Sequence, residues 1–140
     1  MSTKLGLLQA GAIIEAMLKE ATQRNIRFAA AIVDSGGELI QMKRMDGASP
    51  LSARMAFNKA YTAVKWMQDT KAIKGRLFDL TLGNDVRDIA WFGDSRFTPV
   101  WGGIVLWSAD GTLLGALGGS GGTPDQDEEI GQIGASAIKS

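Results

Sequence analysis

The residue types that could carry chemistry in this chain are limited by two absences. The 140 residues include no histidine and no cysteine. A chain without them has no thiolate nucleophile, no Ser-His-Asp arrangement and no Cys-ligated zinc or iron-sulfur centre. Any chemistry therefore relies on carboxylates, lysine, arginine, tyrosine, hydroxyl groups, backbone groups or a bound cofactor, and we expect no structural metal.

The first candidate site is the segment Arg44-Met45-Asp46-Gly47, which lies between a predicted strand and the cap of a predicted helix. Loops in such positions often carry function on a rigid scaffold. The planar guanidinium of Arg44 could clamp a ligand carboxylate or carbonyl, while Asp46 orients the ligand or moves a proton. The alternative is an Arg/Asp pair that only braces the turn.

Lys59 is the second candidate, because the helical residues around it are mostly apolar. A buried lysine loses its proton more easily than a solvated one and could act as a base or form a Schiff base. A lysine paired with a carboxylate, or one that reaches along the surface to water, explains the same pattern. Tyr61 and Thr62, on the same helix, could position a ligand, although helix packing accounts for them equally well.

Glycines are concentrated toward the end of the chain, where ten of the 18 lie between positions 102 and 134. Turns and close packing use many glycines, and this explanation competes with a functional one. In the functional interpretation, residues 118–122 form a backbone nest whose N–H groups face a ligand carboxylate or carbonyl at a helix start. Trp91, Phe97 and Trp101 would then wall an apolar pocket against this backbone, with core or subunit packing as the alternative.

These features together predict one pocket between the Arg44 loop, the Lys59 helix and the second of two hairpins. Its catalytic residues would be Arg44, Asp46 and Lys59. The predicted ligand-binding residues are Tyr61, Thr62, Trp91, Phe97, Trp101, Gly102, Gly103, Gly119 and Ser120.

The elements that must position these residues follow from periodicity and turn residues. Helices are predicted over 5–24, 50–67, 70–80 and 124–138, and a packed loop with a helical turn at 84–90 is predicted over 82–99. Two hairpins are expected, with strands 28–33 and 38–43, then 103–108 and 112–118, and Asp110-Gly111 favours a type I′ turn in the second. The pattern predicts an α/β (α+β) fold in one domain spanning 1–140, an antiparallel sheet of two hairpins flanked by helices.

Three polar residues predict helix boundaries. Asn25 tolerates the left-handed conformation and is expected to end the first helix. Ser49 precedes Pro50 and is expected to cap the helix that follows. Thr123 and Gln126 have the spacing of a capping box at the start of the last helix.

Three blocks of sequence occur in an order and spacing that resemble the GlcG/HbpS family, which includes the PduO C-terminal-like domains. The resemblance covers nearly the whole chain and implies a profilin-like or roadblock-like sandwich that is usually oligomeric. Family members are described as haem-binding or haem-degrading, as cobalamin-associated domains, or as small proteins encoded beside catabolic enzymes, so the shared fold does not settle the function. The blocks are Val33-Asp34-x-x-Gly37-x-Leu39 with Arg44-Met45-Asp46-Gly47-Ala48, then Lys59-Ala60-Tyr61-Thr62-Ala63, then Gly102-Gly103 with Gly115-Ala116-Leu117-Gly118-Gly119-Ser120-Gly121 and Asp127.

Haem is the cofactor that the resemblance suggests, and the missing histidine disfavours it. Only a weak ligand such as Tyr61, Lys59 or Met45, or apolar enclosure without strong ligation, is left for the iron. The main hypothesis is an oligomeric small-molecule-binding protein, with turnover by isomerisation, hydration or hydrolysis left open. A haem- or tetrapyrrole-binding protein and a structural accessory subunit of a catabolic enzyme are the alternatives.

The charge balance bears on partners. Lys plus Arg and Asp plus Glu each number 15, so the formal net charge is zero and neither nucleic acid nor a membrane surface is an expected partner. Because long-range self-repulsion is then small, an exposed apolar patch would be buried against another subunit, and we expect a homo-oligomer. The sequence shows neither a signal-peptide pattern nor a membrane span, which predicts a cytoplasmic location.

Overall fold

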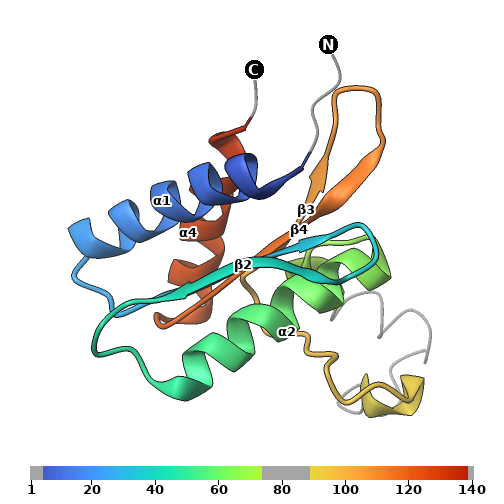
Figure 1. Cartoon of the computed structure of the whole chain (residues 1–140). Helices are drawn as coiled ribbons and strands as arrows, with labels where there is room; N and C mark the ends of the chain where they lie inside the picture. The colour runs from blue at the N-terminus through green and yellow to red at the C-terminus, as the bar shows by residue number, and fades with distance from the viewer. Residues whose placement is uncertain (1–4, 74–88, 139–140) are drawn as a thin grey trace.

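The computed structural model of the chain describes residues 5–73 and 89–138. Its elements follow the order α1 (Leu7–Gln23), β1 (Ala29–Asp34), β2 (Leu39–Arg44), α2 (Pro50–Trp66), a 3₁₀ turn η1 (Ile89–Phe92), β3 (Gly103–Trp107), β4 (Leu113–Ser120) and α4 (Pro124–Ser136), as Figure 1 shows. The predicted helix over 70–80 begins at residues 70–73, and its remainder lies outside the described residues. No helix in the described ranges is long and apolar enough to span a bilayer.

The two hairpins join into one four-stranded antiparallel sheet with the order β2-β1-β4-β3. Strand β1 is central, and its Ala29 lies opposite Arg44 of β2 on one side and Ser120 of β4 on the other. The α+β fold with an antiparallel sheet of two hairpins is therefore confirmed.

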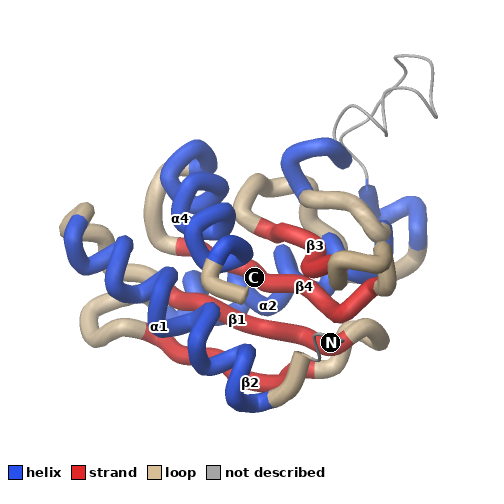
Figure 2. Tube along the Cα trace, turned by 90° about the horizontal axis from the view of Figure 1, so that it is seen from above, coloured by secondary structure: helices blue, strands red, loops and turns tan. Residues whose placement is uncertain are grey.

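Helices cover both faces of the sheet, with α1 and α4 on one face and α2 on the other (Figure 2). The side chains of β1 alternate between these layers, as the pleat of a strand requires. Ala30 and Ile32 belong to the core beneath α1 and α4, whereas Ala29, Ala31 and Val33 pack toward α2. Both faces of β1 are thus buried, which explains its continuous apolar run.

The predicted helix boundaries are confirmed. Asn25 has a φ of 59° and follows the C-cap of α1. The Ser49 hydroxyl accepts a hydrogen bond from the backbone of Ser52 at the start of α2. Thr123 and Gln126 form the capping box of α4.

The type I′ turn predicted at Asp110-Gly111 is wrong, although the hairpin is present. A type I′ turn needs positive φ at both central residues, and only Gly111 has it, at 85°. The Gly111 amide instead donates to the carbonyl of Ser108, and the Ser108 amide donates to Thr112. This is a three-residue loop with glycine in the left-handed position, and the Ser108 side chain, which accepts from the Thr112 amide, favours it over the two-residue turn.

The glycines of β4 let α2 approach the sheet at backbone distance. A Cβ atom on Gly118 would lie 2.0 Å from the carbonyl oxygen of Ala56, and one on Gly103 of β3 would lie 2.3 Å from that of Lys59. Neither position has room for a side chain. Close packing therefore accounts for these two glycines.

Candidate functional site

Lys59 lies at the centre of the contact between α2 and the second hairpin. Its Nζ donates hydrogen bonds of 2.8 Å to the carbonyl of Gly119 and 2.8 Å to Oδ2 of Asp127. The two charged side chains are 1% and 4% exposed. Burial lowers the pKa of the Lys59 amine, and the neighbouring carboxylate opposes that lowering. The arrangement is a buried ion pair that ties α2 to β4 and α4.

Gly102, Gly103 and Gly119 gather around this ion pair. A Cβ on Gly102 would lie 3.1 Å from the Lys59 ammonium, and one on Gly119 would lie 2.4 Å from the Phe28 ring. The structure thus brings together Lys59 and three of the predicted ligand-binding glycines, and it fills the space between them with protein atoms.

Two N–H groups of the predicted anion nest, those of Gly119 and Gly122, are used within the chain. The Gly122 amide donates to Oδ1 of Asp127 at 2.8 Å, and the Thr123 amide donates to the Gln126 side chain at 2.9 Å. The Gly119 amide donates to the carbonyl of Gly102 at 3.0 Å. These donors stabilise the start of α4 and the strand pair instead of facing a cavity.

Tyr61 faces the segment that follows η1. Its hydroxyl donates to Oδ2 of Asp94 at 2.5 Å, and the Arg96 guanidinium lies 4.0 Å from the centre of its ring. Hydrogen bonds from Arg96 and Tyr61 hold the pKa of the Asp94 carboxyl well below its usual range. The Phe97 ring packs 5.8 Å from the Tyr61 ring.

Thr62 fixes the same segment from the neighbouring position on α2. Its buried hydroxyl donates to the carbonyl of Asn58 at 2.7 Å and accepts from the amide of Thr98 at 2.9 Å. Tyr61, Thr62 and Phe97 therefore form a second group, which holds the chain of residues 94–98 against α2.

None of the remaining predicted residues bonds to the Lys59–Asp127 pair within the described part of the chain. Arg44 is the last residue of β2 and Asp46 lies just beyond it; both are exposed, and the Asp46 carbonyl accepts from Arg27 at 3.0 Å. Ser120 lies across β1 from Arg44, so strand spacing separates the two backbones by roughly 10 Å. Trp101 packs under Lys71, with the ammonium 5.0 Å from its ring centre. The side chain of Trp91 lies outside the described part of the chain.

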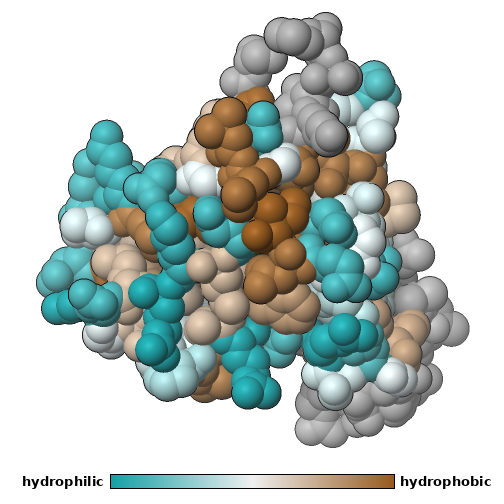
Figure 3. Space-filling model, in the orientation of Figure 1, coloured by the Kyte–Doolittle hydropathy of each residue, from teal (hydrophilic) through white to brown (hydrophobic). Residues whose placement is uncertain are grey.

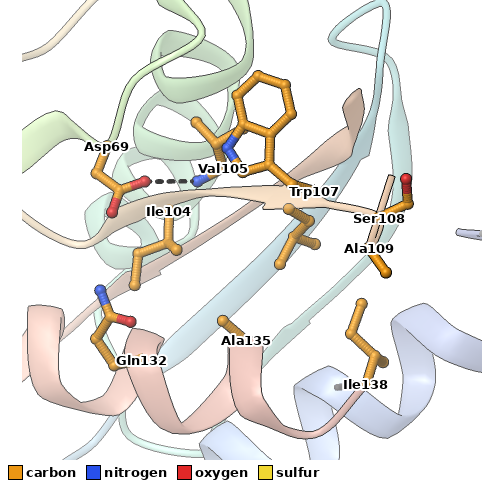
Figure 4. Close-up of a pocket in the computed structure, with 10 residues that line it drawn as sticks. Asp69, Ile104, Val105, Trp107, Ser108, Ala109, Gln132, Ala135 and Ile138 are labelled. Carbon is orange, nitrogen blue, oxygen red and sulfur yellow. Dashed lines mark hydrogen bonds between the residues drawn. The ribbon is translucent and has the colours of Figure 1, made fainter. Parts of the chain in front are cut away.

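A cleft of about 480 Å³ opens at a different place, along the outer edge of β3 and against α4 (Figure 4). We call it the β3–α4 cleft. Ile104 points toward α4, and Leu106 belongs to the same core cluster. Trp107, which is 46% exposed, lies on the opposite side of β3 and forms part of the cleft wall there (Figure 4). The lining residues are Asp69, Ile104, Val105, Leu106, Trp107, Ser108, Ala109, Gln132, Ala135 and Ile138.

Asp69 gives the cleft its charged group. One oxygen, Oδ1, accepts a hydrogen bond of 2.9 Å from the Val105 amide at the sheet edge. The other oxygen points toward the side of the cleft where Gln132 lies (Figure 4). Burial raises the pKa of the Asp69 carboxyl, while the bond from Val105 lowers it.

Glu128 sets the orientation of Gln132 one turn along α4. Glu128 is 7% exposed, and its Oε2 accepts from Nε2 of Gln132 at 2.9 Å. Because a carboxylate only accepts, the amide nitrogen of Gln132 must face it, which leaves the amide oxygen as an acceptor and the second N–H as a donor. The polar end of the cleft therefore combines the Asp69 carboxylate with a Gln132 amide that can accept and donate.

Sequence reasoning missed this cleft. Asp69, Trp107 and Gln132 come from three separate segments and belong to no motif. The available signals were the lone carboxylate in the short link after the 50–67 helix and the tryptophan near the end of the third predicted strand, 103–108. Neither signal indicates a shared site without the strand order of the sheet.

Comparison with known proteins gives consistent matches. The family model described as "Haem degrading protein HbpS-like" matches residues 5–136. The chain is 32% identical over 127 residues to an uncharacterized 15.0 kDa protein from the dhaT-dhaS intergenic region of Citrobacter freundii, covering 86% of this chain and 82% of that protein. It is 33% identical over 120 residues to protein GlcG of Escherichia coli K12, covering 84% of each. The crystal structure of a PduOC:haem complex matches with a TM-score of 0.86 and 28% identity, covering 98% of this chain and 96% of that one.

Proposed function

We propose that this chain, which belongs to the HbpS-like family, is a homo-oligomeric protein that binds a small organic molecule in the β3–α4 cleft. The observation that carries the proposal is the cleft itself, with an apolar wall and with the Asp69 carboxylate and the Gln132 amide at one end. Ligand sites in proteins commonly combine such a wall with a few placed polar groups. The catalytic roles of Arg44, Asp46 and Lys59 stay predictions, since none of the three lines the cleft.

The edge of β3 favours a compact ligand over an extended peptide. A peptide would add a strand by pairing with the outward N–H groups of the edge. Two of these are already bonded, because the Gly103 amide donates to the Thr70 hydroxyl at 3.0 Å and the Val105 amide donates to Asp69 at 2.9 Å. This part of the edge is closed to strand pairing.

Iron ligation by this chain does not fit the structure. Of the three donors that sequence analysis considered, Tyr61 is bonded to Asp94 and Lys59 to Asp127, while Met45 packs against the core beneath α1. With no histidine or cysteine in the sequence, no strong axial donor replaces them.

A tetrapyrrole held by apolar enclosure is the second candidate function. The match to the structure of a PduOC:haem complex favours it. A spectroscopic titration distinguishes the candidates, because specific enclosure gives a saturable Soret change at a fixed stoichiometry. Uptake that continues without saturation contradicts tetrapyrrole binding.

Self-association is supported by apolar side chains on the N-terminal half of α1 (Figure 3). Leu8 is 82% exposed and Leu7 is 64% exposed, and both line a shallow groove with Gln41 of β2. A chain of zero net charge has little long-range repulsion to keep such surfaces apart. We expect Leu8→Glu to lower the subunit number.

Native mass spectrometry of freshly purified protein tests both parts of the proposal in one measurement. Retained small-molecule mass should be present in the wild type and lost in Trp107→Ser, which opens the cleft wall. Phe92→Ser is the matched control, since Phe92 is 49% exposed and Trp107 is 46% exposed. If the retained mass is equal in all three proteins, ligand binding in the cleft is contradicted. If the wild type is purely monomeric, the homo-oligomer is contradicted.

A further inference from the structure

We infer that the β3–α4 cleft selects ligands whose polar end donates hydrogen bonds, a protonated amine above all, over ligands that end in a carboxylate. The inference rests on the proposed function and names the ligand class for the same cleft. It depends on which atoms at the polar end are already bonded and which are left.

The side chains at the polar end offer acceptors. Oδ1 of Asp69 is bonded to the Val105 amide, and Oδ2 has no hydrogen-bond partner among residues 5–73 and 89–138, so Oδ2 is the atom that would face a ligand. One hydrogen of Gln132 Nε2 is bonded to Glu128, so Oε1 remains as an acceptor and the second N–H as a donor on that amide. Among the described residues that line the cleft, none carries a positive charge. The Asp69 carboxylate would therefore repel a ligand carboxylate, whereas an ammonium or hydroxyl group would find acceptors for its hydrogens on Asp69 and Gln132.

Burial strengthens this selection. A carboxylate held away from water is costly, and the raised pKa of Asp69 reflects that cost. An ammonium group beside Oδ2 offsets the cost by attraction and by a charge-assisted hydrogen bond. Glu128 adds to the negative potential, because it is buried one turn away and its Oε1 has no hydrogen-bond partner among the described residues.

The apolar part of the cleft fixes the rest of the ligand. Ile104, Leu106, Ala135 and Ile138 supply aliphatic surface on the α4 side of β3. Trp107 supplies an aromatic surface on the other side of that edge strand (Figure 4). A flat hydrophobic body with a short aminoalkyl arm matches both ends. Three indoles with arms of similar length are therefore suitable probes: tryptamine with an ammonium, tryptophol with a hydroxyl and indole-3-propionate with a carboxylate.

Isothermal titration of the three probes against the purified oligomer provides the test. We expect tryptamine to bind about tenfold or more tightly than indole-3-propionate, with tryptophol between them, since a hydrogen bond to a charged group is worth at least that factor. Asp69→Asn keeps an oxygen for the Val105 amide while removing the charge, and it should reduce the preference about tenfold. Asp125→Asn, which removes an exposed charge at the start of α4, should leave the preference unchanged.

Gln132→Lys is a second variant, at an exposed position, and it leaves the bond between Asp69 and the edge of β3 in place. It should lower the affinity for tryptamine and raise the affinity for indole-3-propionate. Equal affinity for the three probes, an unchanged preference in Asp69→Asn, or no binding of tryptamine overturns the inference. Native mass spectrometry tests the proposed function separately. That function fails if Trp107→Ser and Phe92→Ser retain the same small-molecule mass.

Discussion

Replacing Lys59 with methionine tests whether this lysine supports the fold. Methionine keeps a linear side chain of similar length and removes the ammonium. In the wild type the ammonium lies 2.8 Å from both the Asp127 carboxylate and the Gly119 carbonyl. Without the ammonium, both acceptors lose their hydrogen-bond donor. Because the pair is almost fully enclosed, with exposures of 1% and 4%, removing one partner should cost about 3–5 kcal/mol of unfolding free energy.

The assay is urea unfolding followed by tryptophan fluorescence at one fixed protein concentration, because subunit association would shift stability with concentration. Lys19→Met, at an exposed position of α1, is the control and should change stability by about 0.5 kcal/mol or less. Asp127→Asn completes a double-mutant cycle. The two changes should be less than additive by roughly 1–3 kcal/mol, because the first removes the partner of the second.

The outcome separates two accounts of Lys59. If the lysine is a catalytic base, Lys59→Met abolishes turnover and leaves the fold intact. If it is the buried bridge that the geometry describes, the same variant loses stability whether or not the protein has an activity. A cost below about 1 kcal/mol, or strict additivity with Asp127→Asn, would refute the structural account.

Three further perturbations have clear expectations. Gly118→Ala should destabilise the protein severely, because its Cβ would lie 2.0 Å from a backbone oxygen of α2, whereas Gly36→Ala, whose nearest contact is 3.4 Å, should cost about 1 kcal/mol or less in thermal unfolding. Thr123→Ala should cost about 1 kcal/mol by removing the cap of α4, measured as a lower urea midpoint with an unchanged m value. The lowered pKa of Asp94 contributes stability that is present above the usual carboxyl pKa and is lost as the pH falls through its folded value. Tyr61→Phe removes one of the bonds responsible, so its unfolding free energy should fall less steeply below about pH 4 than that of the wild type.

The parts of the fold that sequence predicted well are those set by local chemistry. Asn25, Ser49 and Thr123 end or begin helices through their own side chains and backbone preferences, so short segments contain the whole signal. The type I′ prediction for the turn at Asp110-Gly111 was wrong for a related reason. Its type depends on the Ser108 side chain and on a register shift in the strand pair, which a dipeptide does not contain.

The candidate site was harder to predict, because its geometry comes from tertiary structure. The apolar surroundings of Lys59 correctly indicated burial, but its partner Asp127 lies 68 positions away. Asp69 and Gln132 reach one cleft only because β3 is the edge strand and α4 lies along one face beside it. No spacing between them along the chain indicates this arrangement.

The residues that hold the fold together and the residues that line the cleft are different, and this separation bears on how one fold can bind different ligands. The blocks that carry the family resemblance contain Lys59, Gly102, Gly119 and Asp127, which together hold α2 against the second hairpin at backbone distance. The polar groups of the cleft lie outside those blocks, on the link after α2 and on the outer part of α4. A substitution among the residues of the family blocks disturbs the packing of the core. A substitution at the edge of β3 changes the wall and the polarity of the β3–α4 cleft. Relatives can therefore share the architecture of this chain and still bind different molecules, and Asp69 is the position where we expect ligand choice to be made.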